Sequence, residues 1–327
     1  MQSSEHATPR APFVGRLRQR LFGLPPEEAS FARRGFLAAD PRARRRLESV
    51  GGLFLRGYHA ALEETSAASL ARRLSQTEDE PRGFAFEGAA MGLALLDALT
   101  PWGGGRWRDF TQSFGAPHVY MMHVGYGWAL ARLRRRVESS LARLDPLLGW
   151  LAVDGYGFHE GYFKWRRYVE RRESPGRLGG YARRAFDQGL GRSVWFVRGA
   201  HVGEVARTVD SFEPSRRADL WSGVGLACAY AGGADRADLG RLSEAAGGFR
   251  PQLAQGAAFA AKTRERAGNP AAHTETACAV ICRLAAREAA EVTDLALRDL
   301  RGGGDLPSFE VWRRRIQNHL AREVAAA

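Results

Sequence analysis

Apolar residues recur along most of this chain at the three- and four-residue spacing of an amphipathic helix. Leu93, Leu96 and Leu99 follow this spacing in one segment, and Leu130 and Leu133 follow it in another. Segments in which β-branched and polar residues alternate, as in a strand, are almost absent. The pattern therefore predicts an all-α protein.

Four polar or glycine-rich segments interrupt the helical pattern and indicate connections. They are residues 1–30, 75–82, 173–180 and 302–304. The first predicts a loosely ordered lead-in that ends near Leu24-Pro25-Pro26. We therefore expect a helical-repeat domain over residues 31–300 and a C-terminal amphipathic helix within residues 301–327.

A glycine, often preceded by a polar residue, recurs inside otherwise apolar helical segments. The series is Gly88, Gly125, Gly161, Gly189, Gly223 and Gly256. By subtraction its members lie 37, 36, 28, 34 and 33 residues apart, and a period near 34 suits a helix–turn–helix unit. The series predicts tandem helical hairpins, arranged as an α-solenoid or as a closed helical array. The alternative is coincidence, because a Gly- and Ala-rich sequence also produces such matches.

Glycine inside a helix lowers stability by about 1 kcal/mol relative to alanine, so another interaction must offset this loss at each of these positions. Close approach of two helices supplies it, since a residue without a side chain lets the backbones pack at short distance. The residues just before the glycines then occupy equivalent places and, if they face inward, line one shared surface. They are Glu87, Glu160, Gln188, Ser222 and Gln255.

The net charge of the 327-residue chain is +12, and arginine carries nearly all of the positive charge. Such a balance attracts nucleic acid or anionic lipid, or it reflects arginines that solvate helix surfaces. The clusters Arg42–Arg46, Arg134–Arg136 and Arg313–Arg315 fall on amphipathic segments, and no nucleic-acid-binding motif accompanies them. We therefore expect no nucleic-acid partner.

Three cysteines, Cys228, Cys278 and Cys282, occur in apolar surroundings. An odd number argues against a disulfide framework and for a reducing compartment. Cys278 and Cys282 share a helix face close to His273, but no second ligand pair follows at zinc-site spacing, which favours buried packing. Neither a signal peptide nor a run of about 18 apolar residues is present, so we expect a cytoplasmic protein without a transmembrane segment.

The densest group of chemically capable residues lies in the segment DGYGFHEGYF, residues 154–163. Polar groups in an apolar segment are costly unless paired, and their pKa values are often shifted. We expect His159 and Glu160 to act as acid/base residues, with Asp154 and Glu87 as orienting partners. The structural alternative is a helix cap at Asp154 and a buried hydrogen bond between His159 and Glu160.

A second group contains His118 and His123, followed by Tyr126 and Trp128. A separation of five places the two histidines about 140° apart around a helix, on different faces. A metal site across helices would resemble carboxylate-bridged bundles, but their Glu-x-x-His pattern is missing. No Walker loop, Rossmann fingerprint, nucleophile elbow or haem-attachment motif occurs. We therefore expect no metal, and the sequence leaves any cofactor unknown.

Long phrases of the sequence resemble a bacterial family of unknown function, sometimes called UnbL, that is encoded beside enediyne polyketide synthases. The phrases are GFLAADPRARRRLESVGGLFLRGY, GFAFEGAAMGLALLDALTP, HVGYGWALARL, LAVDGYGFHEGYF, RRAFDQGLGRSVWF, LWSGVGLACAYAGG and QLAQGAAFAAKTRERAGN. They cover roughly residues 30 to 300. The resemblance implies a role in natural-product biosynthesis, at the conversion of a polyketide polyene into an enediyne core, and supplies no catalytic residues.

Together these observations suggest an enzyme that acts on a long unsaturated acyl or polyene substrate, free or bound to a carrier, in an apolar cavity. The expected substrate-binding residues are Tyr120, His123, Trp128, Tyr156, Phe158, Tyr162, Gln188, Trp195, Trp221, Ser222 and Gln255. The alternative is a non-catalytic helical scaffold for a polyketide synthase, an acyl carrier or a membrane partner. An open groove lined with arginine would favour the scaffold, and a closed apolar cavity ending in His159 and Glu160 would favour the enzyme.

Overall fold

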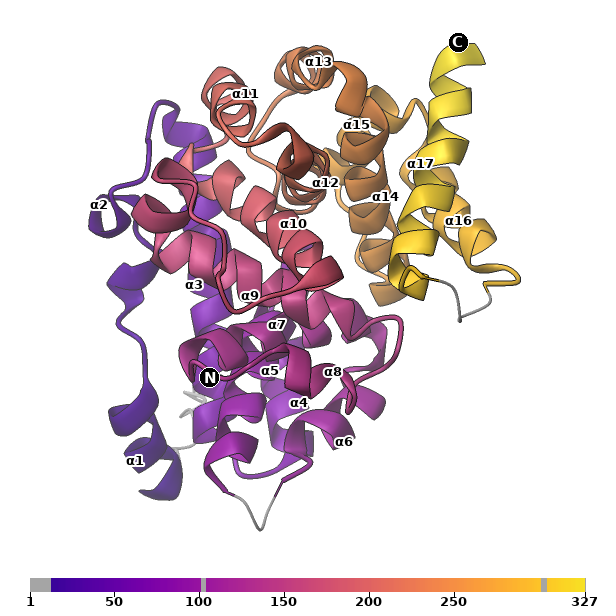
Figure 1. Ribbon diagram of the computed structural model, residues 1–327. Helices are drawn as coiled ribbons and strands as arrows, with labels where there is room; N and C mark the ends of the chain where they lie inside the picture. Colours follow the sequence, from indigo (N-terminus) through magenta and orange to yellow (C-terminus); the bar gives the residue numbers. More distant parts are fainter. Residues whose placement is uncertain (1–12, 101–103, 301–304, 327) are drawn as a thin grey trace, which may run out of the picture.

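The computed structural model describes residues 13–100, 104–300 and 305–326, and within these ranges every regular element is a helix (Figure 1). The all-α prediction is therefore confirmed for this part of the chain. The long helices are α3 (Pro41–Glu63), α5 (Arg82–Leu99), α7 (Val119–Arg132), α9 (Trp150–Phe163), α10 (Gly180–Val197), α12 (Pro214–Ala231), α14 (Arg250–Ala267), α16 (Ala286–Leu297) and α17 (Ser308–Ala326).

Each long helix from α5 to α14 packs against the long helix before it and the long helix after it in the chain. Short helices complete the connections between them (Figure 1). These are α4 (Ala67–Ser75), α6 (Arg106–Gln112), α8 (Glu138–Leu141), α11 (Val202–Asp210), α13 (Arg236–Ala245) and α15 (Ala272–Ala277), with the single turns η2 (Ala116–His118), η3 (Arg166–Glu170), η4 (Gly247–Phe249) and η5 (Cys278–Cys282). α3 also contacts α12, so the series curls back on itself and encloses an interior.

Glycines on the long helices lie directly against the backbone of the neighbouring helix. A methyl group placed at Gly189 of α10 would lie 1.8 Å from the carbonyl oxygen of Asp154 on α9. Gly223 of α12 stands in the same way against the carbonyl oxygen of Gln188 on α10, at 1.9 Å. No side chain fits at such distances, so the close approach that compensates for glycine inside a helix is present.

The glycine of α9 that makes this contact with the preceding long helix is Gly155, which faces the carbonyl oxygen of Val124 on α7. Gly161, which the sequence series includes, faces the side chain of Ser193 instead. The polar residue in the equivalent place on α9 is therefore Asp154, just before Gly155, and not Glu160.

A cluster of polar side chains joins α3 and the segment before α5 to α12 and α14. Arg46 of α3 donates to the carbonyl oxygen of Ala231 at the end of α12 (2.8 Å) and pairs with Glu80 before α5 (2.6 Å). Arg264 of α14, which is 2% exposed, donates to the carbonyl oxygen of Tyr230 (2.7 Å) and also pairs with Glu80 (3.0 Å). These charge-assisted contacts hold the curled-back arrangement closed.

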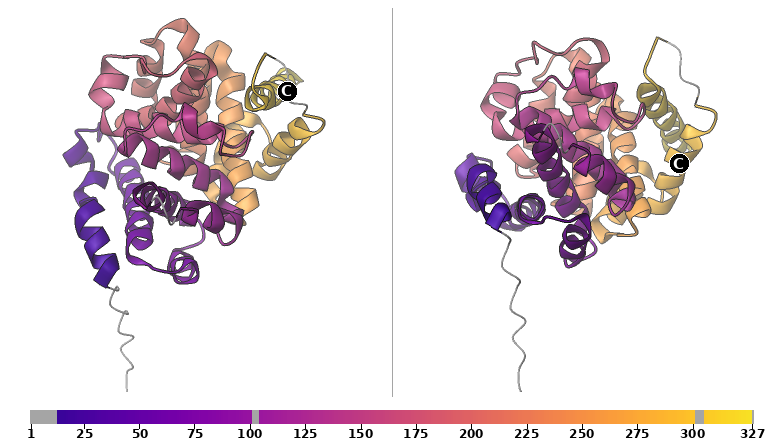
Figure 2. Two further views of the ribbon diagram at one scale, coloured as in Figure 1. Left: turned by 60° about the horizontal axis from the view of Figure 1, so that its bottom comes forward. Right: turned by 90° about the horizontal axis from the view of Figure 1, so that it is seen from below.

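The two ends of the chain also form helices. The predicted lead-in contains α1 (Phe13–Phe22) and the turn η1 (Pro26–Ala29), and α2 (Phe31–Arg34) follows them; residues 1–12 lie outside the described part. α1 lies at the edge of the molecule (Figure 2). The segment 301–327 contains α17, whereas residues 301–304 lie outside the described part. None of the described helices is long and apolar enough to cross a membrane.

Candidate functional site

The interior enclosed by the long helices contains a small apolar cavity. Residues from η1, α3, α5, α7, α9, α10 and α12 line it. Phe54, Phe84, Phe158, Tyr162 and Phe196 supply aromatic walls. The cavity volume is about 50 Å³. This small space therefore lies where seven elements converge.

A buried ion pair, Glu87 of α5 and Arg192 of α10, forms the polar part of the cavity wall. Glu87 is 1% exposed and Arg192 4% exposed. An Arg192 Nη atom lies 3.9 Å from Glu87 Oε1, too far for a hydrogen bond, so this carboxylate oxygen has no hydrogen-bond partner in the described part of the chain. An unpaired, buried carboxyl oxygen at a cavity is available to a ligand.

Burial raises the pKa of Glu87 from its ordinary value of 4.5 to about 7. Arg192 opposes this effect because its positive charge favours the ionised form, and Asp154 adds to it through its negative charge. Trp128 lies close enough to lower the pKa of Glu87, although its indole nitrogen is not aligned for a hydrogen bond. A carboxyl group with this pKa changes its protonation state near neutral pH, as a general acid or base requires.

Asp154 of α9 fixes the position of the Arg192 side chain. Its two carboxylate oxygens accept hydrogen bonds from Arg192 Nη1 (2.6 Å) and from Gln188 Nε2 (2.8 Å). The Arg192 guanidinium also lies over the ring of Phe158, 4.5 Å from its centroid. Arg192 is thus held between a carboxylate and an aromatic face, which fixes the cation beside Glu87.

Buried polar contacts continue from Asp154 through the neighbouring helices. Ser222 Oγ of α12 lies 3.2 Å from Gln188 Oε1 and 2.8 Å from Gln255 Oε1, so its single proton serves one of the two. Gln255 Oε1 of α14 also accepts a hydrogen bond from Arg313 Nε of α17 (3.2 Å). Gln188, Ser222 and Gln255, expected from the sequence to line one surface with Glu87 and Glu160, therefore form a polar chain through the helix contacts and do not line the apolar cavity, whereas Glu87 does.

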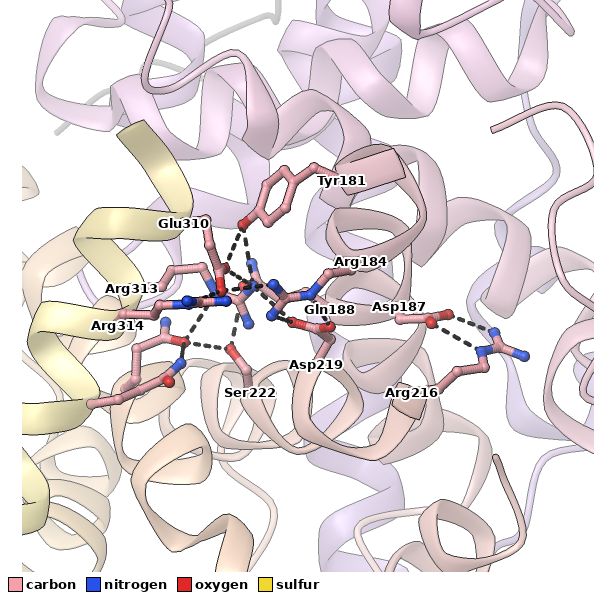
Figure 3. A network of polar contacts seen from close by, with 12 residues as sticks. Tyr181, Arg184, Asp187, Gln188, Arg216, Asp219, Ser222, Glu310, Arg313 and Arg314 are labelled. Atoms are coloured by element: carbon pink, nitrogen blue, oxygen red, sulfur yellow. Dashed lines mark hydrogen bonds and ion pairs between the residues drawn. The ribbon is translucent and has the colours of Figure 1, made fainter. Parts of the chain in front are cut away.

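This polar chain ends in an ion-pair network that anchors α17 (Figure 3). Arg313 is fully buried and pairs with Asp219 of α12 (2.8 Å) and with Glu310 (3.2 Å). Arg184 of α10 pairs with the same two carboxylates, and Tyr181 donates to Glu310 (3.0 Å). Each of the two carboxylates is paired with arginine side chains, which indicates a structural role.

Two further polar groups on the cavity wall lack hydrogen-bond partners among the described residues. They are the indole nitrogen of Trp128 and the hydroxyl group of Tyr230. Gly83 leaves room for that hydroxyl, since a methyl group placed there would lie 2.0 Å from it. A second cavity of about 30 Å³ shares Arg192 and Tyr230 with the first.

His159 and Glu160, the expected acid/base pair, are buried on α9 but do not line the apolar cavity. His159 Nδ1 lies 3.2 Å from Glu160 Oε1, and burial lowers the pKa of this histidine. Glu160 accepts hydrogen bonds from Lys164 at 2.7 and 2.9 Å. Burial alone would raise the pKa of Glu160, but the hydrogen bonds to His159 and Lys164 outweigh it and lower that pKa. Glu160 is thus an ionised, paired group, and its catalytic role stays a prediction.

Glu160 and Tyr156 instead lie on a basic surface hollow of about 520 Å³. Its cationic residues are Arg134, Arg135, Arg136, Lys164, Arg167 and Arg177. Glu138 and Glu160 are the two acidic residues on its wall, and both already have partners. The hollow therefore presents net positive charge.

The remaining predicted residues lie in four places. Trp128, Phe158 and Tyr162 line the apolar cavity, and Tyr120 lines the second one. His123 packs against Trp107 beside a surface hollow, with Nδ1 bonded to the carbonyl oxygen of Val119. Trp195 and Trp221 are fully buried in the helix contacts. In the described ranges, no three His, Cys, Asp or Glu side chains are placed to hold a metal ion.

Sequence reasoning missed Arg192 and Tyr230. Arg192 had a usable signal, because a lone charge within the apolar helical segment GLGRSVWF is costly unless a buried partner neutralises it. Tyr230 follows a run of small residues and carries no such signal.

No curated protein and no solved structure matches this chain. Residues 13–320 match the family described as DUF1702, a protein of unknown function, and the chain therefore belongs to that family.

Proposed function

We propose that the protein is an enzyme that binds a slender hydrophobic chain in the apolar cavity and moves a proton with Glu87. The carboxyl group of Glu87 carries this proposal, because it combines a raised pKa, an unpaired oxygen and a position on the cavity wall. The aromatic and apolar walls suit a conjugated polyene or unsaturated acyl chain. The resemblance to the enediyne-associated family suggests a polyketide polyene as the substrate and natural-product biosynthesis as the setting.

The chemistry that the site supports is the shift of a double bond by proton transfer. Protonated Glu87 would give its proton to one carbon of the chain, and the resulting carboxylate would take a proton from another carbon. The π electrons move between these two steps, so no oxidant or reductant is consumed. Arg192 stabilises the carboxylate form of Glu87 between the steps, and Asp154 positions Arg192.

We further infer that the chain is built from tandem helical hairpins with a period near 34 residues. The equivalent backbone contacts of Gly125, Gly155, Gly189, Gly223 and Gly256 with the preceding long helix support this interpretation. In such an arrangement the cavity lies inside a curled helical array.

Deuterium incorporation tests the proposed reaction. A synthetic conjugated polyenoyl thioester is incubated in D₂O with wild type, Glu87→Gln or His159→Ala, and the recovered chain is examined by mass spectrometry. Wild type and His159→Ala are expected to introduce deuterium, whereas Glu87→Gln is not, because an amide can neither donate a proton to a carbon of the chain nor remove one from it. Deuterium incorporation by Glu87→Gln at the wild-type rate would refute the role of Glu87.

A second candidate function is a scaffold that docks an acidic acyl carrier domain of a polyketide synthase. The basic hollow favours it, because net positive charge attracts an acidic partner. Arg134→Glu/Arg136→Glu should then weaken carrier binding in calorimetry, with Arg207→Glu on a distant surface helix as the control. If the hollow serves only as a dock, Glu87→Gln leaves product formation unchanged while the double variant abolishes it.

A further inference from the structure

Helix α1 exposes an apolar face that no described part of the protein covers. Phe13 is 74% exposed, Leu21 64%, Val14 49% and Leu17 48%. Seven large apolar side chains are exposed among the described residues, and these four belong to a single helix of ten residues. Such concentration distinguishes α1 from the scattered exposure that is normal on a protein surface.

The opposite face of α1 attaches the helix to the protein. A methyl group placed at Gly15 would lie 2.3 Å from the carbonyl oxygen of Glu63, at the end of α3. Phe22 is half-buried and packs against the core. α1 is therefore held in a fixed orientation. It lies at the edge of the molecule (Figures 1 and 2), and its four exposed apolar side chains face away from the protein.

Arginines flank the exposed apolar face on both sides. At about 100° per residue, Phe13, Val14, Leu17 and Leu21 fall within a sector of roughly 100°. Arg16 and Arg20 lie on one side of this sector and Arg18 on the other, and the helix contains no acidic residue. An apolar face bordered by basic side chains is the pattern of a helix that lies in the interface of an anionic membrane.

We propose that α1 binds the surface of an anionic lipid bilayer, with its four apolar side chains in the headgroup region and its arginines at the lipid phosphates. A second copy of this chain is a poorer occupant, because two such faces would bring arginines against arginines. The turn η1 follows α1 directly, and its residues Glu28 and Ala29 line the apolar cavity. η1 therefore connects α1 to the cavity wall, although lipid binding does not depend on what the cavity holds.

Vesicle co-sedimentation tests this inference with the full chain. Wild type should bind vesicles of phosphatidylcholine and phosphatidylglycerol about tenfold or more tightly than vesicles of phosphatidylcholine alone, and added salt should weaken this binding. Leu17→Asp should reduce binding about tenfold or more, because it places a charge in the apolar sector. Leu295→Asp is the matched control, since Leu295 is 42% exposed on α16, and it should bind as wild type.

Circular dichroism verifies that both variants keep their helices, so that a loss of binding reflects the surface. Equal binding by Leu17→Asp and wild type would overturn the inference, as would the absence of wild-type binding to either vesicle. If sedimentation velocity instead shows a dimer that Leu17→Asp dissociates, without vesicle binding, the face joins two copies and the lipid inference is wrong.

Discussion

The contact between Gly189 and the backbone of α9 predicts an unusual response to a small substitution. Alanine inside a helix is ordinarily more stable than glycine by about 1 kcal/mol. At Gly189, however, the added methyl group would lie 1.8 Å from the carbonyl oxygen of Asp154 and 2.7 Å from the backbone nitrogen of Phe158. Both atoms belong to a helix backbone, so no side-chain rotation can relieve the clash.

Gly189→Ala must therefore move α10 away from α9 and loosen the packing on both helices. Overpacking of this kind costs about 1–3 kcal/mol even where side chains can adjust, and a rigid backbone places the cost at the upper end. After subtraction of the propensity gain of about 1 kcal/mol, we expect the free energy of unfolding to fall by about 2 kcal/mol. The shift also moves Asp154, the residue that holds Arg192.

Gly240 provides the matched control. It lies inside α13, and a methyl group placed there would meet nothing within 4 Å. Gly240→Ala should therefore raise the free energy of unfolding by about 0.5–1 kcal/mol, the ordinary propensity gain. Urea unfolding followed by circular dichroism measures both variants. If Gly189→Ala is as stable as Gly240→Ala, the close helix approach is not what these glycines provide.

Three further perturbations bear on the cavity. Glu87→Gln should gain about 3 kcal/mol of unfolding free energy relative to wild type as pH rises from about 4.5 to 8. The reason is that the raised pKa of Glu87 in the folded state stabilises wild type only while the carboxyl group is protonated. Urea unfolding at both pH values measures this, and an equal change with pH in the two proteins would contradict it. Arg192→Met should lower the free energy of unfolding by about 3–5 kcal/mol, because it leaves Asp154 buried without its cation. The control Arg207→Met removes only a surface ion pair and should change the free energy of unfolding by less than about 1 kcal/mol. Ala227→Phe should fill the cavity and abolish the fluorescence of a bound conjugated polyene fatty acid, and unchanged binding would place the ligand elsewhere.

The sequence was sufficient to predict the helical class and the importance of the glycines, because both follow from local rules of spacing and steric size. It misassigned one member of the glycine series. The segment around Gly155 and Gly161 contains two glycines preceded by acidic residues, and only the packing of α9 against α7 distinguishes them. That single choice led to Glu160 in place of Asp154 as the inward-facing residue.

The cavity depended on long-range pairing that no local pattern encodes. Glu87 and Arg192 are more than 100 residues apart in the chain, and they meet only because α3 returns to α12 and brings α5 and α10 to one interior. From the sequence, His159 and Glu160 were the better candidates for acid/base residues than Glu87 and Arg192, because they are adjacent in the chain. In the fold, Lys164 neutralises Glu160, and Glu160 lies on the wall of the surface hollow and not at the apolar cavity.

Direct titration of the Glu87 carboxyl group tests the central claim most closely. Carboxyl carbons of glutamate, labelled with ¹³C, can be followed by NMR from pH 4 to pH 9, and the Glu87 signal is assigned by its loss in Glu87→Gln. The account predicts that this signal titrates with a pKa of about 7 and that a conjugated polyene ligand perturbs it. A signal that titrates near 4.5, unaffected by the ligand, would show a solvated carboxylate and would contradict the proposed site.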